Sequence, residues 1–130
     1  MMRIVNEKQL KNCTFLDYQP IDMLPFSLAS ADLGVVTLNE ETALTSVPSK
    51  TFNLLAVGSP LLCIAPEKAE IARIVSKYEN GFVCPASNPR KIAEYIVDLS
   101  INSDLHKDMS IASLEAAKEF TKENAYLYLN

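Results

Sequence analysis

Three consecutive residues, Ser49, Lys50 and Thr51, place a hydroxyl, an ammonium group and a second hydroxyl at the predicted start of a helix. Pro48 turns the chain just before them, and Gly58 ends the helix. The first backbone N–H groups of a helix have no helical partner, and the helix dipole adds partial positive charge there. Together with the ammonium group, these donors favour binding of an anion.

Other residue types that could do chemistry are sparse. His106 is the only histidine, so the sequence assembles no Ser-His-Asp set and no histidine-rich metal cluster. Glu40 and Glu41 are more typical of a solvated loop than of an acid–base pair. The chain has only three glycines and no P-loop or GxGxxG motif. The residues by themselves therefore predict an anion-binding domain without a recognisable catalytic group.

Composition sets the broad class of protein. The chain has 130 residues, of which 48% are hydrophobic and 22% charged, which suits one folded domain over residues 1–130. Its net charge of −4, with scattered cations, argues against a nucleic-acid partner. Cys13, Cys63 and Cys84 lack metal-ligand spacing, and we expect them to be buried thiols on strands. Neither a signal peptide nor a stretch of membrane-spanning length is evident, so we expect a cytoplasmic location.

Apolar periodicity and turn residues predict strands and helices in alternation. The strands are expected over residues 13–18, 33–38, 61–65 and 82–84, and the helices over residues 1–11, 23–31, 49–57, 67–79, from 89 onward, and 104–124. This order predicts an α/β fold, a Rossmann-like parallel sheet with helices on both faces. Ligands of such sheets bind at the carboxyl ends of the strands, where residues 39–50 form the longest polar connection.

Four stretches in this order resemble the C-terminal, donor-binding half of family 4 glycosyltransferases, which have the GT-B fold. They are NCTFLDYQPIDMLPFSLASADLGVVTL, SVPSKTFNLLAVGSPLLCIAP, ENGFVCPASNPRKIAEYIVDL and AAKEFTKENA, and together they extend over residues 11–125. The resemblance implies a retaining glycosyltransferase of polysaccharide or glycoconjugate biosynthesis. Its donor substrate would be a nucleotide sugar, with no further cofactor and no metal, and a separate N-terminal domain would bind the acceptor.

The resemblance also implies roles for individual residues. Ser49, Lys50 and Thr51 would present the helix N-terminus to the diphosphate, and Tyr18 and Gln19 would lie around the base, largely through backbone groups. The end of the loop over residues 39–47 would face the sugar. The location implied is cytoplasmic, including a peripheral position at the inner membrane face.

Two departures from the family pattern stand out. Thr45 and Asn53 occupy the positions where many members carry two glutamates, the second of which binds the ribose hydroxyls. Asn53 can still donate and accept hydrogen bonds, on a shorter and uncharged stem. The first two strands of the domain and the whole N-terminal domain have no counterpart here, and residues 1–11 match the helix before the strand at 13–18. We therefore expect the isolated chain to lack transferase activity and its exposed sheet edge to favour self-association.

Two other functions remain open on the sequence. One is a non-catalytic nucleotide-binding or interaction module, for which the aromatic and aliphatic residues 126–129 could dock on a separate domain or pack on the chain's own sheet. The other is a fragment of a nucleotide-sugar epimerase, a class with the same architecture. An epimerase needs acid and base side chains, which the sequence does not show at suitable positions.

Overall fold

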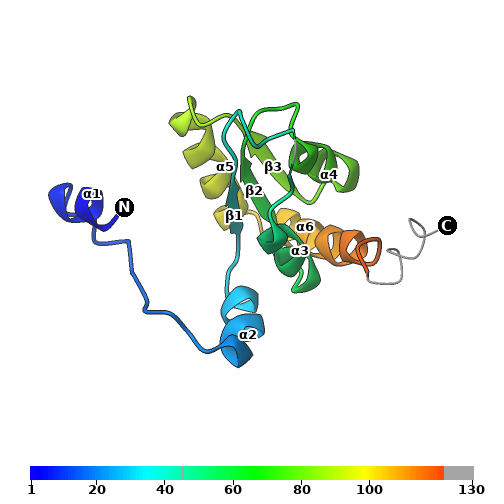
Figure 1. The fold of residues 1–130 in the computed structure, drawn as a ribbon, viewed down its shortest axis with the longest axis horizontal. Helices are drawn as coiled ribbons and strands as arrows, with labels where there is room; N and C mark the ends of the chain where they lie inside the picture. Colours follow the sequence, from blue (N-terminus) through cyan, green and yellow to red (C-terminus); the bar gives the residue numbers. More distant parts are fainter. Residues whose placement is uncertain (45, 122–130) are drawn as a thin grey trace.

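The fold is built around a three-stranded parallel sheet, described here from a computed structural model over residues 1–44 and 46–121. The strands are β1 (Gly34–Thr37), β2 (Leu61–Ile64) and β3 (Gly81–Cys84), in the spatial order β1-β2-β3 (Figure 1). Val36 lies opposite Cys63, and Cys63 lies opposite Val83. A single helix connects each strand to the next, which is the expected α/β alternation.

The remaining elements are helical. They are α1 (Met2–Glu7), a 3₁₀ turn (Ile21–Met23), α2 (Leu24–Ala29), α3 (Ser49–Ala56), α4 (Glu70–Tyr78), α5 (Pro89–Ile101) and α6 (Ser103–Ala117). The last predicted helix is shorter than expected, because residues 118–121 form turns and bends. In the part of the chain that the structure describes, no helix is both long and apolar enough to cross a bilayer.

Helices cover both faces of the sheet, as the sequence predicts. On one face, Val36 and Cys63 belong to the main apolar core with Leu54 of α3 and Ile71 of α4. Successive strand residues point to opposite faces, so Phe82 points to the other face. There its ring stacks on Tyr95 of α5, with the ring centroids 4.3 Å apart.

Helix α6 is anchored by a buried polar contact. Helix α6 lies against α3, α4 and α5. The hydroxyl of Ser113, on α6, donates a hydrogen bond of 2.9 Å to the carbonyl oxygen of Ser59, and both residues are buried. This bond fixes α6 near the loop that leads into β2.

The predicted strand over residues 13–18 is wrong. These residues have no regular secondary structure, and within the described chain no backbone–backbone hydrogen bond involves them. A strand is stable only when a neighbour completes its hydrogen bonds. Here β1 pairs with β2 alone, and no described strand lies beside residues 13–18. Cys13 is exposed as a result, so only Cys63 and Cys84 are the buried strand thiols that we expected.

Two details concern the residues between α4 and β3. Helix α4 ends at Tyr78, one residue before the predicted end, and its C-cap Glu79 adopts the left-handed conformation with φ 54°. Gly81 is the first residue of β3, and a Cβ added there would lie 2.0 Å from the carbonyl oxygen of Leu61. The glycine is therefore required by the close approach of two strands, not by a helix end.

Candidate functional site

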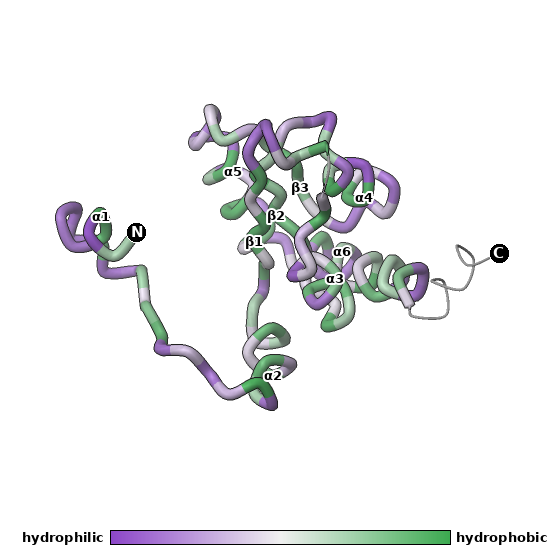
Figure 2. The backbone as a smooth tube through the Cα atoms, viewed as in Figure 1, coloured by the Kyte–Doolittle hydropathy of each residue, from purple (hydrophilic) through white to green (hydrophobic). Residues whose placement is uncertain are grey.

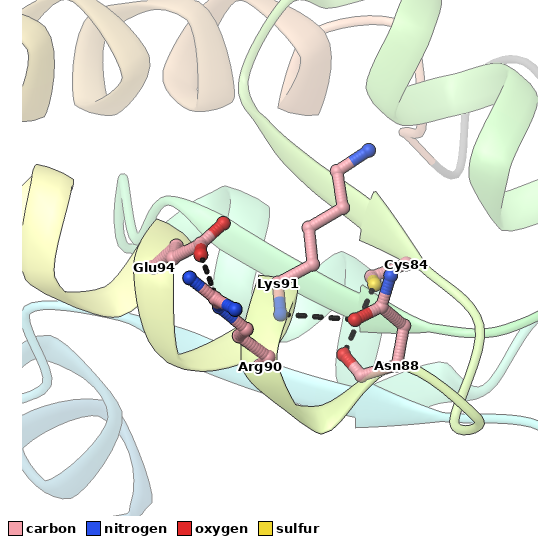
Figure 3. Close-up of polar contacts among 5 residues, drawn as sticks. All are labelled: Cys84, Asn88, Arg90, Lys91 and Glu94. Carbon is pink, nitrogen blue, oxygen red and sulfur yellow. Dashed lines mark hydrogen bonds and ion pairs between the residues drawn. The ribbon is translucent and has the colours of Figure 1, made fainter.

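Three helices begin at the carboxyl edge of the sheet, and only α3 begins without a local neutralising group. Asn88 caps α5, since its Oδ1 accepts a hydrogen bond of 3.1 Å from the backbone N–H of Lys91 (Figure 3). Glu70 lies in the first turn of α4, where a carboxylate offsets the helix dipole. Helix α3 has no side-chain cap and no acidic residue in its first turn. Among these three helices, α3 is thus the one best suited to an external anion.

The donors at this helix start are the amides of Ser49 and Lys50. Thr51 N–H already donates to the carbonyl oxygen of Pro48, at 2.9 Å. Within the described residues, the Ser49 and Lys50 amides have no acceptor. Both residues are exposed, so solvent or a ligand can reach these amides.

The Lys50 side chain reaches past the helix start to the free edge of β1. Its Nζ donates a hydrogen bond of 3.1 Å to the carbonyl oxygen of Val35. The backbone groups of Gly34 and Leu38 bond toward β2, so those of Val35 point the other way. The ammonium group therefore satisfies one hydrogen-bonding group on the edge of β1 that faces away from β2, beside which no strand lies among the described residues.

Thr51 and Asn53 lie on different sides of α3. Thr51 is fully buried, and in the described part of the molecule its hydroxyl has no hydrogen-bond partner. Asn53 is exposed and lines a shallow pocket of about 310 Å³ between α2 and α3, together with Leu24 and Leu28. A ligand at the α3 start could therefore reach Asn53, one turn further along, but not the Thr51 hydroxyl.

Tyr18 and Gln19 lie beside α2, because the strand that was expected to place them at the carboxyl edge does not form. They line a pocket with Pro20, Ile21 and Leu24, among other residues. Tyr18 is 97% exposed, and Gln19 Nε2 donates to the carbonyl oxygen of Asp17 at 2.9 Å. Leu24 also lines the Asn53 pocket. The two pockets are neighbours, whereas Ser49 and Lys50 line neither of them; Thr45 lies outside the described residues.

The loop before α3 is ordered by its own side chains. Asn39 Oδ1 accepts hydrogen bonds from the backbone N–H and the hydroxyl of Thr42, at 2.9 and 2.6 Å. Ala43 is completely buried. The Glu40 carboxylate pairs, at 3.7 Å, with Lys68, which lies in the loop between β2 and α4 at the same carboxyl edge of the sheet. Lys68 was not singled out from the sequence, although its position near the start of the predicted helix over residues 67–79, at the same edge of the sheet, was a usable signal.

The α5 start is organised as a closed local network (Figure 3). Cys84 Sγ donates to the carbonyl oxygen of Asn88 at 3.7 Å, and Arg90 pairs with Glu94 at 3.1 Å. A hydrogen bond to Tyr95 raises the pKa of Lys91. These contacts join Arg90 and Lys91 to residues of α5 itself. The start of α5 is therefore a poorer candidate for an anion site than the start of α3.

The remaining titratable groups among the described residues do not form a second candidate site. Across residues 1–44 and 46–121, no group of three or more His, Cys, Asp or Glu side chains could hold a metal ion. His106 Nε2 lies 3.0 Å from the carbonyl oxygen of Asp32, at the amino end of β1. Burial raises the pKa of the Cys63 thiol to about 12, so this thiol stays protonated and unreactive.

The fold and this edge define an α/β domain with an uncapped helix N-terminus at the carboxyl edge of a parallel sheet. No family model matches the chain, and no solved structure matches it. Two curated proteins do. The chain is 31% identical over 93 residues to "Probable glycosyltransferase WbjE" of Pseudomonas aeruginosa, covering 72% of this chain and 23% of that protein.

The second relative is "Putative colanic acid biosynthesis glycosyl transferase WcaI" of Escherichia coli K12. It is 25% identical over 122 residues, which is 94% of this chain and 30% of that protein. The chain is therefore related in sequence to glycosyltransferases, which confirms the resemblance seen in its motifs. It spans less than a third of the length of either relative.

Proposed function

We propose that this chain is the nucleotide-sugar-binding part of a GT-B glycosyltransferase, with the start of α3 as the diphosphate site. The observation that carries the proposal is the α3 N-terminus, which alone among the three helix starts at the sheet edge has neither a cap nor an acidic neighbour. The relatedness to two glycosyltransferases supplies the class of ligand. A helix N-terminus is a general binding site for phosphate groups.

The reaction that such a site would serve moves negative charge onto the diphosphate. The bond between the anomeric carbon and the terminal phosphate oxygen breaks, and a bond forms to the oxygen of an acceptor hydroxyl. The hydroxyl proton and a nucleoside diphosphate are released. The backbone N–H groups of Ser49 and Lys50, held in place by the helix, would donate hydrogen bonds to the diphosphate oxygen atoms. These bonds would stabilise the developing charge. The Lys50 ammonium would add to them after leaving the Val35 carbonyl oxygen.

The isolated chain should bind the donor without transferring the sugar. Its described residues present no acid–base pair at the α3 start, and the acceptor would be held by additional polypeptide of the kind that the relatives possess. The name of WcaI refers to colanic acid biosynthesis, so we propose a polysaccharide or glycoconjugate as product. We propose a cytoplasmic location, including a peripheral position at the inner membrane face.

Calorimetric titration of the chain with UDP, GDP and their sugar derivatives tests this function. One nucleotide series should bind, and Lys50→Ala should lower the affinity about tenfold, the cost of one charge-assisted hydrogen bond. Lys107→Ala is the matched control, since Lys107 is an exposed lysine on α6. Failure of every nucleotide to bind would overturn the proposal, as would equal losses in the two variants.

A non-catalytic interaction module is the second candidate. It is favoured by the apolar side chains exposed before β1, among which Leu16 is 77% and Phe26 69% exposed. Such exposure is typical of surfaces that bind another polypeptide. If the chain is such a module, the calorimetric titration should show no binding of any nucleotide. Its affinity for the partner polypeptide should be the same in Lys50→Ala as in wild type.

A further inference from the structure

Strand β1 is one of the two edge strands of the sheet, and its outer edge has unused hydrogen-bonding groups. Among the described strands, β1 pairs only with β2. The alternation of a parallel ladder directs the backbone groups of Val35 and Thr37 away from β2. The Lys50 ammonium occupies one of them, the carbonyl oxygen of Val35. The side chains of Val35 and Thr37 are exposed as well, so this strand is uncovered on its edge and on one face.

The same chain carries an extended segment that lacks a partner. Residues 13–18 are rich in β-branched and aromatic side chains, which favour strands. They form no backbone–backbone hydrogen bonds with the described residues, and Phe15, Leu16 and Tyr18 are 41%, 77% and 97% exposed. Figure 2 shows apolar residues along this connection and along α2, outside the body that surrounds the sheet.

We propose that two copies of the chain exchange these segments, so that residues 13–18 of each copy add as a strand to the β1 edge of the other. The chain supplies both halves of the contact, an open edge and a strand-forming segment without a partner. The connection from residue 19 to residue 33 contains the 3₁₀ turn and α2, and α2 is held against α3. In the structure this arrangement holds the segment away from its own β1, with α1 far from the sheet (Figure 1).

The exchange satisfies polar and apolar groups together. Backbone N–H groups of the incoming segment replace Lys50 at the Val35 carbonyl oxygen, and its carbonyl groups accept from the outward N–H groups of β1. Every second side chain of the segment then covers the exposed face of Val35 and Thr37. Because the contact is reciprocal, each dimer contains it twice, which is the usual arrangement of a symmetric, domain-swapped pair.

Sedimentation velocity of the full chain across a wide concentration range gives the first test. The wild-type chain should form dimers. Phe15→Pro/Leu16→Pro removes N–H groups on both sides of the segment, and Val35→Pro removes an outward N–H from β1. Each variant should be monomeric alone. An equimolar mixture of the two should form a heterodimer, because one variant keeps the edge and the other keeps the segment.

The controls separate strand pairing from general stickiness. Phe15→Ala/Leu16→Ala keeps the backbone donors, so it should still dimerise, more weakly than wild type. Circular dichroism and urea unfolding check that each variant is folded, and Thr37→Pro replaces Val35→Pro if the latter unfolds. A wild-type monomer at every concentration overturns the proposal. So does a dimer that persists in both proline variants, a mixture that stays monomeric, or an alanine variant as monomeric as the proline variant.

Discussion

The Nζ atom of Lys50 lies 3.1 Å from the carbonyl oxygen of Val35, so a side chain at the start of α3 closes part of the free edge of β1. The contact joins residues that are fifteen positions apart in the sequence. It links the two features on which our proposals rest, the uncapped start of α3 and the outer edge of β1. A strand that paired with the Val35 carbonyl oxygen would release this ammonium group, which would then be available to a ligand at the helix start.

The first prediction concerns the strength of this contact. Lys50→Ala should change the free energy of unfolding by less than about 1 kcal/mol, because the hydrogen bond is exposed and water can replace it. Urea unfolding followed by circular dichroism measures the change. Lys50→Arg, which keeps a donor, should match wild type. A loss of several kcal/mol in Lys50→Ala would mean that the lysine is an essential part of the sheet.

The second prediction concerns the buried hydroxyl of Thr51. Thr51→Val should leave the free energy of unfolding unchanged or raise it by about 1 kcal/mol, because the hydroxyl is buried without a partner among the described residues. Nucleotide affinity should not change, since the Thr51 hydroxyl is buried and the donors at the helix start are the amides of Ser49 and Lys50. Thr51→Ala, which leaves a cavity, is the destabilising control. A loss of nucleotide affinity in Thr51→Val would place the hydroxyl at the ligand.

The third prediction compares two glycines of the sheet. A Cβ at Gly81 would meet the backbone oxygen of Leu61 at 2.0 Å, whereas one at Gly34 would meet the end of the Leu54 side chain at 2.5 Å. A side chain can move and a paired strand cannot, so Gly81→Ala should cost more than Gly34→Ala. We expect about 3 kcal/mol or more against about 1–2. Equal urea midpoints for the two variants would contradict the close approach of β2 and β3.

The fourth prediction follows from the burial of Cys63. Burial raises its pKa from 9.0 to about 12 in the folded protein. The unfolded thiol ionises first, so the stability due to Cys63 is complete below pH 9 and falls as the pH rises toward 12. At pH 10, one unit above the pKa of the unfolded thiol, the free energy of unfolding is lower by about 1.4 kcal/mol. Urea unfolding of wild type and of Cys63→Ala at pH 8 and pH 10 measures this loss. The variant has no thiol at residue 63, so its free energy of unfolding should fall less between the two pH values.

The fifth prediction tests the cap of α5. Asn88→Ala should lower the free energy of unfolding by about 1 kcal/mol, because the Lys91 N–H loses its acceptor. Asn88→Asp keeps a side-chain oxygen in the same place and should stay close to wild type. If both variants lose the same free energy, the cap seen in Figure 3 does not contribute. Either thermal or urea unfolding measures these changes in stability.

Local sequence signals were sufficient for most elements. The apolar runs around Val36, Leu62 and Val83 predicted the three strands, and proline or asparagine marked the starts of α3 and α5. The resemblance to glycosyltransferases was also readable from the motifs, and the two relatives confirm it. These features depend on residues close together in the chain, so periodicity, caps and turns report them directly.

Tertiary structure decided the rest, because pairing and burial involve residues far apart. Residues 13–18 have the composition of a strand, yet no strand among the described residues lies beside them to complete their hydrogen bonds. Tyr18 and Gln19 lie by α2 as a consequence. The sequence by itself determined an α/β chain with a helix that starts at Ser49. Only the tertiary structure showed that the Thr51 hydroxyl points into the core and that the Lys50 ammonium lies on the open edge of β1.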